Sequence, residues 1–214
     1  MENAKLNFHM STMGGGKTLE IILDNHRKAR ANFSTLIAKP FVDKKAAESI
    51  ETRFGKIRRG ADILIGDGDD VSELISKKIE QRQREMAQVA LNLTAGPSWI
   101  VYIDEAQFLS HQHVEQLRRN VVDTDLATVE AYGLVTDFRG QLFPGSEALL
   151  RLADKRQQID SWCENIDCGR QAVYNARMID GKITLEGESV MIDGIEAEYK
   201  ALCSKDFHGG IDNV

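Results

Sequence analysis

The chain of 214 residues is 42% hydrophobic and 28% charged, proportions typical of a soluble globular protein with one main domain. It carries 27 lysines and arginines against 33 aspartates and glutamates, and the resulting net charge of -6 disfavours nucleic acid as the main partner. No apolar run is long enough to cross a membrane and no secretory signal is visible. The three cysteines suit a reducing cytoplasm better than a disulfide framework.

Hydrophobic spacing and turn residues predict strands and helices that alternate along the chain. The expected elements, in order, are a strand over 5–10, a helix over 18–31, a strand over 34–38, mostly loop over 41–62, a short strand over 63–65, a helix to about 91 capped by Asp70 or Ser72, a strand over 99–103, a helix to about 120 capped by Ser110, a strand over 129–134 and a helix over 146–153. The strand over 99–103, WIVYI, is apolar throughout, as expected of a strand buried on both faces.

This alternation to about residue 155 predicts an α/β fold with an open, mostly parallel sheet, of the kind that carries a phosphate-binding loop. Beyond that point the chain has short strands, paired turns such as Asp180-Gly181, and all three cysteines. We therefore expect an α/β ATP-binding domain over residues 1–155 and a second, small domain over residues 156–214.

The segment between the first strand and the first helix, STMGGGKT (11–18), approaches the phosphate-binding pattern G-x-x-x-x-G-K-[ST]. Such a loop binds phosphate because its backbone N–H groups surround the anion at a helix N-terminus. Lys17 is expected to contact the outer phosphates of ATP, and Thr18 to ligate Mg²⁺. Ser11 departs from the leading glycine of the pattern, but the three glycines at 14–16 give the backbone freedom to compensate.

A second polar motif, VYIDEAQF, begins inside the apolar strand and continues past its end. In folds with a phosphate-binding loop, the first carboxylate at this place holds Mg²⁺, so Asp104 is expected to reach the metal through water. Glu105 would lie beside it and point into the cleft. Two adjacent carboxylates repel each other, so such a pair is normally kept for a cation or a proton transfer.

These two motifs, combined with two others in the chain, resemble the type II thymidine kinase family, the cytosolic class with a zinc-bearing lobe. The resemblance extends over nearly the whole chain. It is carried by Met13-x-x-Gly16-Lys17-Thr18, Lys39-Pro40-x-x-Asp43, Ile103-Asp104-Glu105-Ala106-Gln107-Phe108 and Tyr132-Gly133-Leu134-x-Thr136-Asp137-Phe138-Arg139-Gly140-x-x-Phe143. It implies transfer of the γ-phosphoryl group of ATP to the 5'-hydroxyl of thymidine or deoxyuridine.

The resemblance also implies a role for each matching residue. Glu105 would be the general base for the sugar hydroxyl, Asp43 would accept from the ribose 3'-hydroxyl, and Arg139 would contact phosphate or anchor its loop. The implied ATP site comprises Ser11, Thr12, Met13, Gly14, Gly15, Gly16, Lys17, Thr18, Asp104 and Gln107. The implied nucleoside site comprises Met13, Asp43, Gln107, Phe108, Leu134, Phe138, Phe143, Asn175, Val190, Ile192, Gly194 and Tyr199.

In this family a lasso-like loop of the small lobe encloses the nucleoside, and VMIDG (190–194) followed by Tyr199 matches that loop. Backbone groups near Val190 and Ile192 would read the thymine edge. Gly194 would lie near the sugar, and Tyr199 would close over the pocket.

The small lobe also holds the candidate zinc ligands. Structural zinc takes four ligands in a tetrahedron, and Cys163, Cys168 and Cys203 supply three. Three residues after the third cysteine, where the family has Cys or His, this chain has Asp206, with His208 two residues further on. The fourth ligand is therefore open between these two, and a metal-free lobe with free cysteines is the alternative. The other histidines are expected to bind no metal.

Two other functions stay open at this point. A nucleotide sensor would have lost turnover through Ser11, but Asp104 and Glu105 are intact. An ATPase acting on nucleic acid fits poorly with the acidic charge and the short chain. The resemblance favours ATP and a small nucleoside as partners, no membrane, and a homotetramer, which is the assembly of the family.

Overall fold

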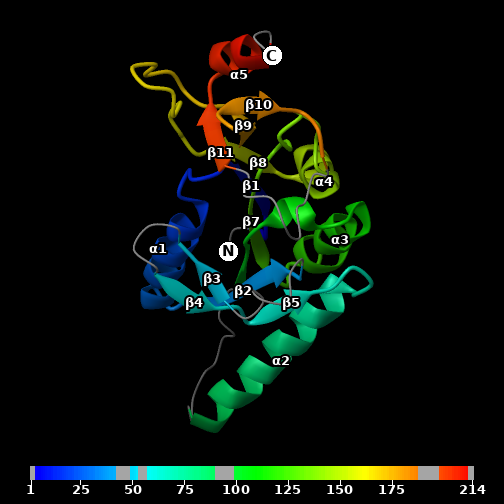
Figure 1. Ribbon diagram of the computed structural model, residues 1–214. Helices are drawn as coiled ribbons and strands as arrows, with labels where there is room; N and C mark the ends of the chain where they lie inside the picture. The colour runs from blue at the N-terminus through cyan, green and yellow to red at the C-terminus, as the bar shows by residue number, and fades with distance from the viewer. Residues whose placement is uncertain (1–2, 42–48, 53–56, 90–98, 188–197, 212–214) are drawn as a thin grey trace.

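The computed structural model describes residues 3–41, 49–52, 57–89, 99–187 and 198–211 (Figure 1). Its centre is a six-stranded sheet in the order β5-β2-β6-β7-β1-β8, in which every neighbouring pair of strands is parallel. The strands are β1 (Leu6–Met10), β2 (Ser34–Pro40), β5 (Ile63–Ile65), β6 (Trp99–Ile103), β7 (Thr128–Gly133) and β8 (Lys155–Gln158). The predicted open, parallel α/β sheet is confirmed.

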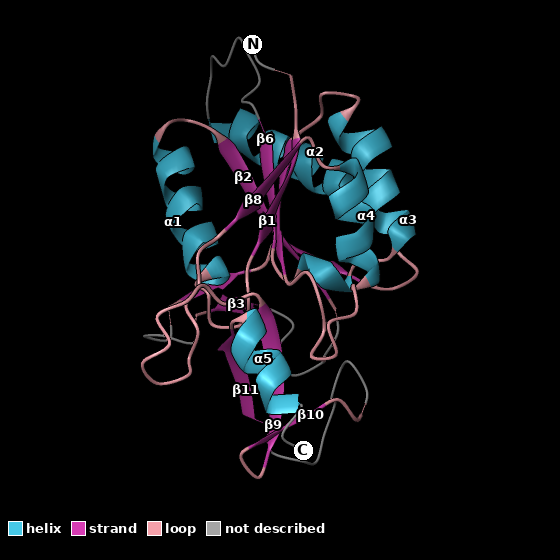
Figure 2. Cartoon of the chain, turned by 90° about the horizontal axis from the view of Figure 1, so that it is seen from above, coloured by secondary structure: helices cyan, strands magenta, loops and turns pink. Residues whose placement is uncertain are grey.

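Helices lie on both faces of the sheet (Figure 2): α1 (Lys17–Arg30) on one, and α2 (Val71–Val89), α3 (His111–Gln116) and α4 (Pro144–Leu152) on the other. Alternate residues of β6 therefore face two apolar layers. Val101 and Ile103 pack in the cluster that includes α2, α3 and α4, whereas Ile100 and Tyr102 pack with Ile21 of α1. Because both faces are covered, β6 needs no polar side, which explains the unbroken apolar sequence.

The helix starts follow the capping residues. Asp70 Oδ1 accepts from the backbone N–H groups of Ser72 and Glu73, at 2.9 and 3.1 Å, so Asp70 caps α2. Ser110 caps α3 by accepting from the backbone N–H of His113. After α3 the chain continues as a short π-helix, η2 (Leu117–Val122), so helical structure ends close to the predicted residue 120. In the described part of the chain, no helix combines the length and apolarity that a membrane span requires.

Two sequence-based expectations need correction. The segment 41–62, predicted to be mostly loop, contains a hairpin of β3 (Ser49–Glu51) and β4 (Arg58–Gly60). Strand β4 has the sequence RRG and is exposed throughout, so it shows no hydrophobic pattern. Helix α4 starts at Pro144, two residues before the predicted start, because proline fits the first helical position, where no backbone donor is needed.

A small lobe lies beyond the carboxyl ends of the strands of the large sheet (Figure 2). It consists of the antiparallel sheet β10-β9-β11, made of β9 (Tyr174–Ile179), β10 (Lys182–Thr184) and β11 (Glu198–Leu202), followed by helix α5 (Ser204–Ile211). A separate cluster that includes Cys163, Ile183 and Phe207 forms its core. The boundary expected between residues 155 and 156 falls inside β8, whose pairing with β1 runs to Gln158.

Candidate active site

The glycine-rich loop connects β1 to the N-terminus of α1, the context that a phosphate-binding loop needs. Gly14 and Gly16 have left-handed backbones, with φ of 73° and 82°, which glycine adopts without steric cost. Lys17, buried at the start of the helix, turns back and donates to the carbonyl of Thr12 at 2.8 Å. The loop therefore has the turn, the helix terminus and the cation that a phosphate-binding loop needs.

Ser11 occupies the place of the leading glycine without backbone strain, since it is not among the residues with positive φ. Its N–H donates to the carbonyl of Gly133 at 3.3 Å, which joins the loop to the end of β7. Its hydroxyl lies against Gly15, where a Cβ would overlap it. The serine is thus accommodated because position 15 carries no side chain.

Asp104 follows β6 and lies under the loop, only 3% exposed. Its Oδ2 accepts from the Thr18 hydroxyl at 3.1 Å and its Oδ1 accepts from the backbone N–H of Glu105 at 3.0 Å. Burial, together with the neighbouring negative charge of Glu105, raises the pKa of Asp104 to about 6. The hydroxyl of Thr18 and the carboxylate of Asp104 are therefore neighbours at the start of α1.

Glu105 has a left-handed backbone, with φ of 55°, which is uncommon for a residue other than glycine. Its carboxylate accepts from Gln107 Nε2 at 2.5 Å, and Gln107 Oε1 accepts in turn from the backbone N–H of Leu134 at 3.1 Å. The amide of Gln107 thus joins the acid to the end of β7. Gly133 makes room for this bridge, since a Cβ there would lie 2.9 Å from Gln107 Oε1.

These groups line a cavity of about 360 Å³, within the size range of small-molecule sites. The lining combines residues of the phosphate-binding loop, Glu105, and apolar and aromatic side chains. The lining residues are Met13, Gly14, Gly16, Lys17, Thr18, Leu19, Glu51, Thr52, Glu105, Gln107, Phe108, Leu134, Thr136, Asp137, Phe138, Phe143, Asn175 and Tyr199.

Aromatic side chains in the cavity lining contact one another and nearby arginines. Phe108 and Phe143 meet edge to face, with ring centroids 5.7 Å apart. The guanidinium groups of Arg139 and Arg177 each lie over the ring of Phe138, 5.3 Å from its centroid. Arg139 also forms an ion pair with Asp137: its Nε and Nη2 atoms lie 2.9 and 2.8 Å from Asp137 Oδ2. Of the two expectations for Arg139, these contacts match loop anchoring.

Most of the expected site residues therefore come together. Ser11, Thr12, Gly15 and Asp104 lie outside the cavity lining, and Asp43, Val190, Ile192 and Gly194 lie outside the described residues. Five lining residues were given no site role from the sequence: Leu19, Glu51, Thr52, Thr136 and Asp137. Thr136 and Asp137 stand inside the TDFRG motif, whereas Glu51 and Thr52 lie at the hairpin that showed no periodic signal.

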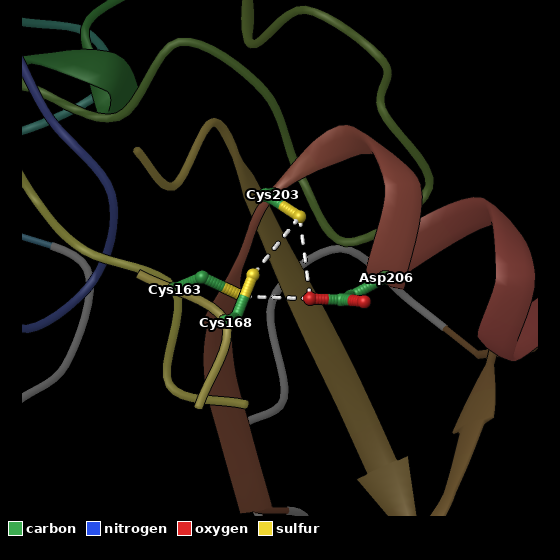
Figure 3. A group of neighbouring side chains, drawn as sticks. All are labelled: Cys163, Cys168, Cys203 and Asp206. Carbon is green, nitrogen blue, oxygen red and sulfur yellow. Dashed lines mark hydrogen bonds between the residues drawn. The ribbon is translucent and has the colours of Figure 1, made fainter. Parts of the chain in front are cut away.

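The candidate metal ligands of the small lobe also meet (Figure 3). One ligand atom each from Cys163, Cys168, Cys203 and Asp206 lie within 4.8 Å of one another. The sulfurs of Cys168 and Cys203 are 3.7 Å apart, and tetrahedral zinc with bonds of about 2.3 Å places sulfurs about 3.8 Å apart. Asp206 supplies the fourth atom of this cluster. His208 instead packs its ring against Tyr174 and Phe207.

A parallel sheet with a glycine-rich loop, lysine and threonine after β1, and an acid after β6, defines a nucleotide-binding protein of the phosphate-loop class. The sequence model of the thymidine kinase family matches residues 4–207. The thymidine kinase of Ruegeria pomeroyi is 38% identical over 204 residues, covering 94% of this chain and 92% of the relative. The thymidine kinase of Jannaschia sp. is 34% identical and covers 99% of this chain and 98% of the relative. That of Enterobacteria phage T4 is also 34% identical and covers 94% of each chain.

The chain therefore belongs to the thymidine kinase family. Membership of this family makes it an enzyme whose substrates are ATP and a small-molecule nucleoside.

Proposed function

We propose that this enzyme transfers the γ-phosphoryl group of ATP to the 5'-hydroxyl of thymidine or deoxyuridine, with Glu105 as the general base. The observation that carries the proposal is the shared cavity, whose lining includes the phosphate-binding loop, aromatic side chains and Glu105. Phosphates held by the loop and a base held by the aromatic side chains would bring the sugar hydroxyl near this acid. Such positioning supplies much of the rate in phosphoryl transfer.

The role of Glu105 requires a carboxylate that is ionised and held still within reach of the hydroxyl. Gln107 engages one carboxylate oxygen, at 2.5 Å, and the other oxygen is the proposed proton acceptor. The left-handed backbone at Glu105 supports the same role, because uncommon backbone conformations of this kind concentrate at functional sites.

The backbone of the loop and Lys17 would hold the triphosphate. Thr18 and Asp104 are the residues that would hold Mg²⁺, with Asp104 acting through water. When bound, the ion neutralises the charge of the phosphates. The raised pKa of Asp104 supports this assignment, because a buried carboxylate beside a second acid is stabilised by a nearby cation.

Phe108, Phe138 and Phe143 would surround the base, and Tyr199 would close over it. The roles of Asp43, Val190, Ile192 and Gly194 stay predictions.

In the small lobe, Cys163, Cys168, Cys203 and Asp206 would hold a structural Zn²⁺. The unpaired state of the three thiols supports a cytoplasmic location. The homotetramer implied by the family resemblance stays a prediction.

A coupled assay with a panel of deoxynucleosides tests the proposal. Glu105→Gln should reduce kcat at least about 100-fold, because the amide cannot accept the proton, while MgATP affinity stays within about twofold. Glu147→Gln, which removes an exposed carboxylate paired with His111, is the matched control and should retain turnover.

Unchanged turnover in Glu105→Gln would remove this acid from the mechanism. ATP binding without any nucleoside monophosphate would indicate the sensor instead. ATP hydrolysis that DNA stimulates and thymidine does not would indicate the nucleic-acid ATPase.

A further inference from the structure

Two hydrogen bonds connect the phosphate-binding loop to residues that follow the large sheet. The Thr12 hydroxyl donates to the hydroxyl of Ser161 at 2.7 Å, and both side chains are buried, with 2% and 7% of their surface exposed. The next residue, Met13, donates its backbone N–H to Asn175 Oδ1 at 2.7 Å. Two consecutive residues of the loop are therefore bound to parts of the chain that come after the large sheet.

Asn175 connects three separate segments. It lies on β9 and is only 4% exposed. Its Oδ1 accepts from Met13, and its Nδ2 donates to the carbonyl of Thr136 at 3.3 Å. With its oxygen and its nitrogen both engaged, the side chain fixes the loop after β1 relative to the loop after β7. This use differs from the nucleoside contact that the family resemblance implies.

The three consecutive glycines make the free loop costly to order, so contacts that fix its path should favour phosphate binding. Residues 14–16 are consecutive glycines, and glycine loses more conformational entropy on ordering than any other residue. Backbone N–H groups bind an anion well only when they already point at it, because ordering a loop on binding reduces affinity. Thr12 and Met13 directly precede the glycines, so fixing them fixes the path on which the glycines begin.

Both contacts are made by residues close to the cysteine cluster. Ser161 precedes Cys163 by two residues. Asn175 of β9 pairs with Ala201 of β11, and Ala201 precedes Cys203 by two residues. The lobe also approaches the glycines directly, since a Cβ at Gly14 would lie 3.8 Å from the Glu164 carboxylate. The residues that hold the loop are thus next to the segments that carry the cluster.

We propose that Ser161 and Asn175 are positioning residues of the ATP site, which hold the phosphate-binding loop in its binding conformation before the nucleoside arrives. This inference rests on the proposed ATP site. It assigns the small lobe a part in binding ATP, in addition to its proposed part in enclosing the nucleoside.

The test measures the Kd of MgATP by titration calorimetry on the full chain, without nucleoside. Asn175→Leu removes both hydrogen bonds of the amide and should weaken MgATP binding about tenfold, by the size of effect expected for two hydrogen bonds. Asn120→Leu is the matched control: it removes an asparagine that donates to Ser72 at 3.3 Å, far from the loop, and should leave Kd unchanged.

A second set of variants keeps the inference testable where Asn175→Leu fails to fold. Thr12→Val removes the donor of the contact with Ser161 and should weaken binding about fivefold, whereas Thr12→Ser keeps the hydroxyl and should restore most of the affinity. Ser161→Ala should match Thr12→Val, and the double variant should be no weaker than either, because both lose the same bond.

The outcomes separate the inference from the proposed function. Wild-type protein that bound no MgATP would overturn both. If the wild type binds MgATP and Asn175→Leu binds it equally well but has a higher KM for thymidine, Asn175 reads the nucleoside and the inference is wrong. Equal Kd values for Thr12→Val and Thr12→Ser would also overturn it.

Discussion

Replacing Asp104 by asparagine should stabilise the metal-free protein while it removes activity. Asp104 is buried under the phosphate-binding loop, where it accepts from the Thr18 hydroxyl and from the backbone N–H of Glu105. Asparagine has the same shape: its oxygen can accept from the backbone and its amide can face the threonine. The substitution therefore removes the charge and keeps the packing, so the change in stability reports the cost of the charge.

The raised pKa sets the size and the sign of the effect. Burial, and then the charge of Glu105, raise the pKa of Asp104 from 3.8 to about 6. Such a shift corresponds to about 3 kcal/mol, part of which belongs to the repulsion by Glu105. Because the folded state binds the proton more tightly, the wild type loses stability as the pH rises from about 4 to about 6. The variant cannot ionise at this position, so its stability does not fall over this pH range for this reason.

Urea unfolding in EDTA at two pH values measures the effect. At pH 7.5, Asp104→Asn should be about 2–3 kcal/mol more stable than the wild type, and at pH 5 the advantage should fall to about half. Asp67→Asn, at an exposed turn, controls for the change in net charge. Turnover with MgATP should fall at least about tenfold, because the proposed metal carboxylate is gone. A variant no more stable than the wild type at pH 7.5, or an advantage independent of pH, would refute the reasoning.

Three further perturbations test the packing, the capping and the metal cluster. Gly145→Ala should cost about 2 kcal/mol or more in urea unfolding, because the new Cβ would lie 2.5 Å from the Ala106 carbonyl oxygen; a neutral effect would contradict this contact. Ser110→Ala should cost about 1 kcal/mol by the same assay, through loss of the α3 cap, and MgATP affinity should not change. Chelation of the purified protein should lower its Tm and make the three cysteines react with a thiol reagent, whereas an unchanged Tm would argue against structural zinc.

Much of the fold could be predicted from local sequence. The apolar run WIVYI, the capping residues Asp70 and Ser110, and the glycines between a strand and a helix each act over a few residues, so each signal is readable in the chain. The hairpin of β3 and β4 left no such signal. Its three-residue strands pair with each other, and Ile50 is buried in the cluster that includes Ile21 and Tyr102, a contact that depends on residues distant in the sequence.

The site divides in the same way. The residue types and spacing of Gly16-Lys17-Thr18 and Asp104-Glu105 could be read as candidate site motifs, because a phosphate-binding loop and a strand-end carboxylate are local arrangements. Three matters needed the tertiary structure: whether Asp206 or His208 joins the cysteines, what Gln107 and Asn175 bind, and which hairpin residues line the cavity. Asp206 and His208 are two residues apart and equally plausible in sequence, and the first turn of α5 places Asp206 beside the sulfurs. Sequence determines which groups are available, whereas the contacts between distant segments determine which of them meet.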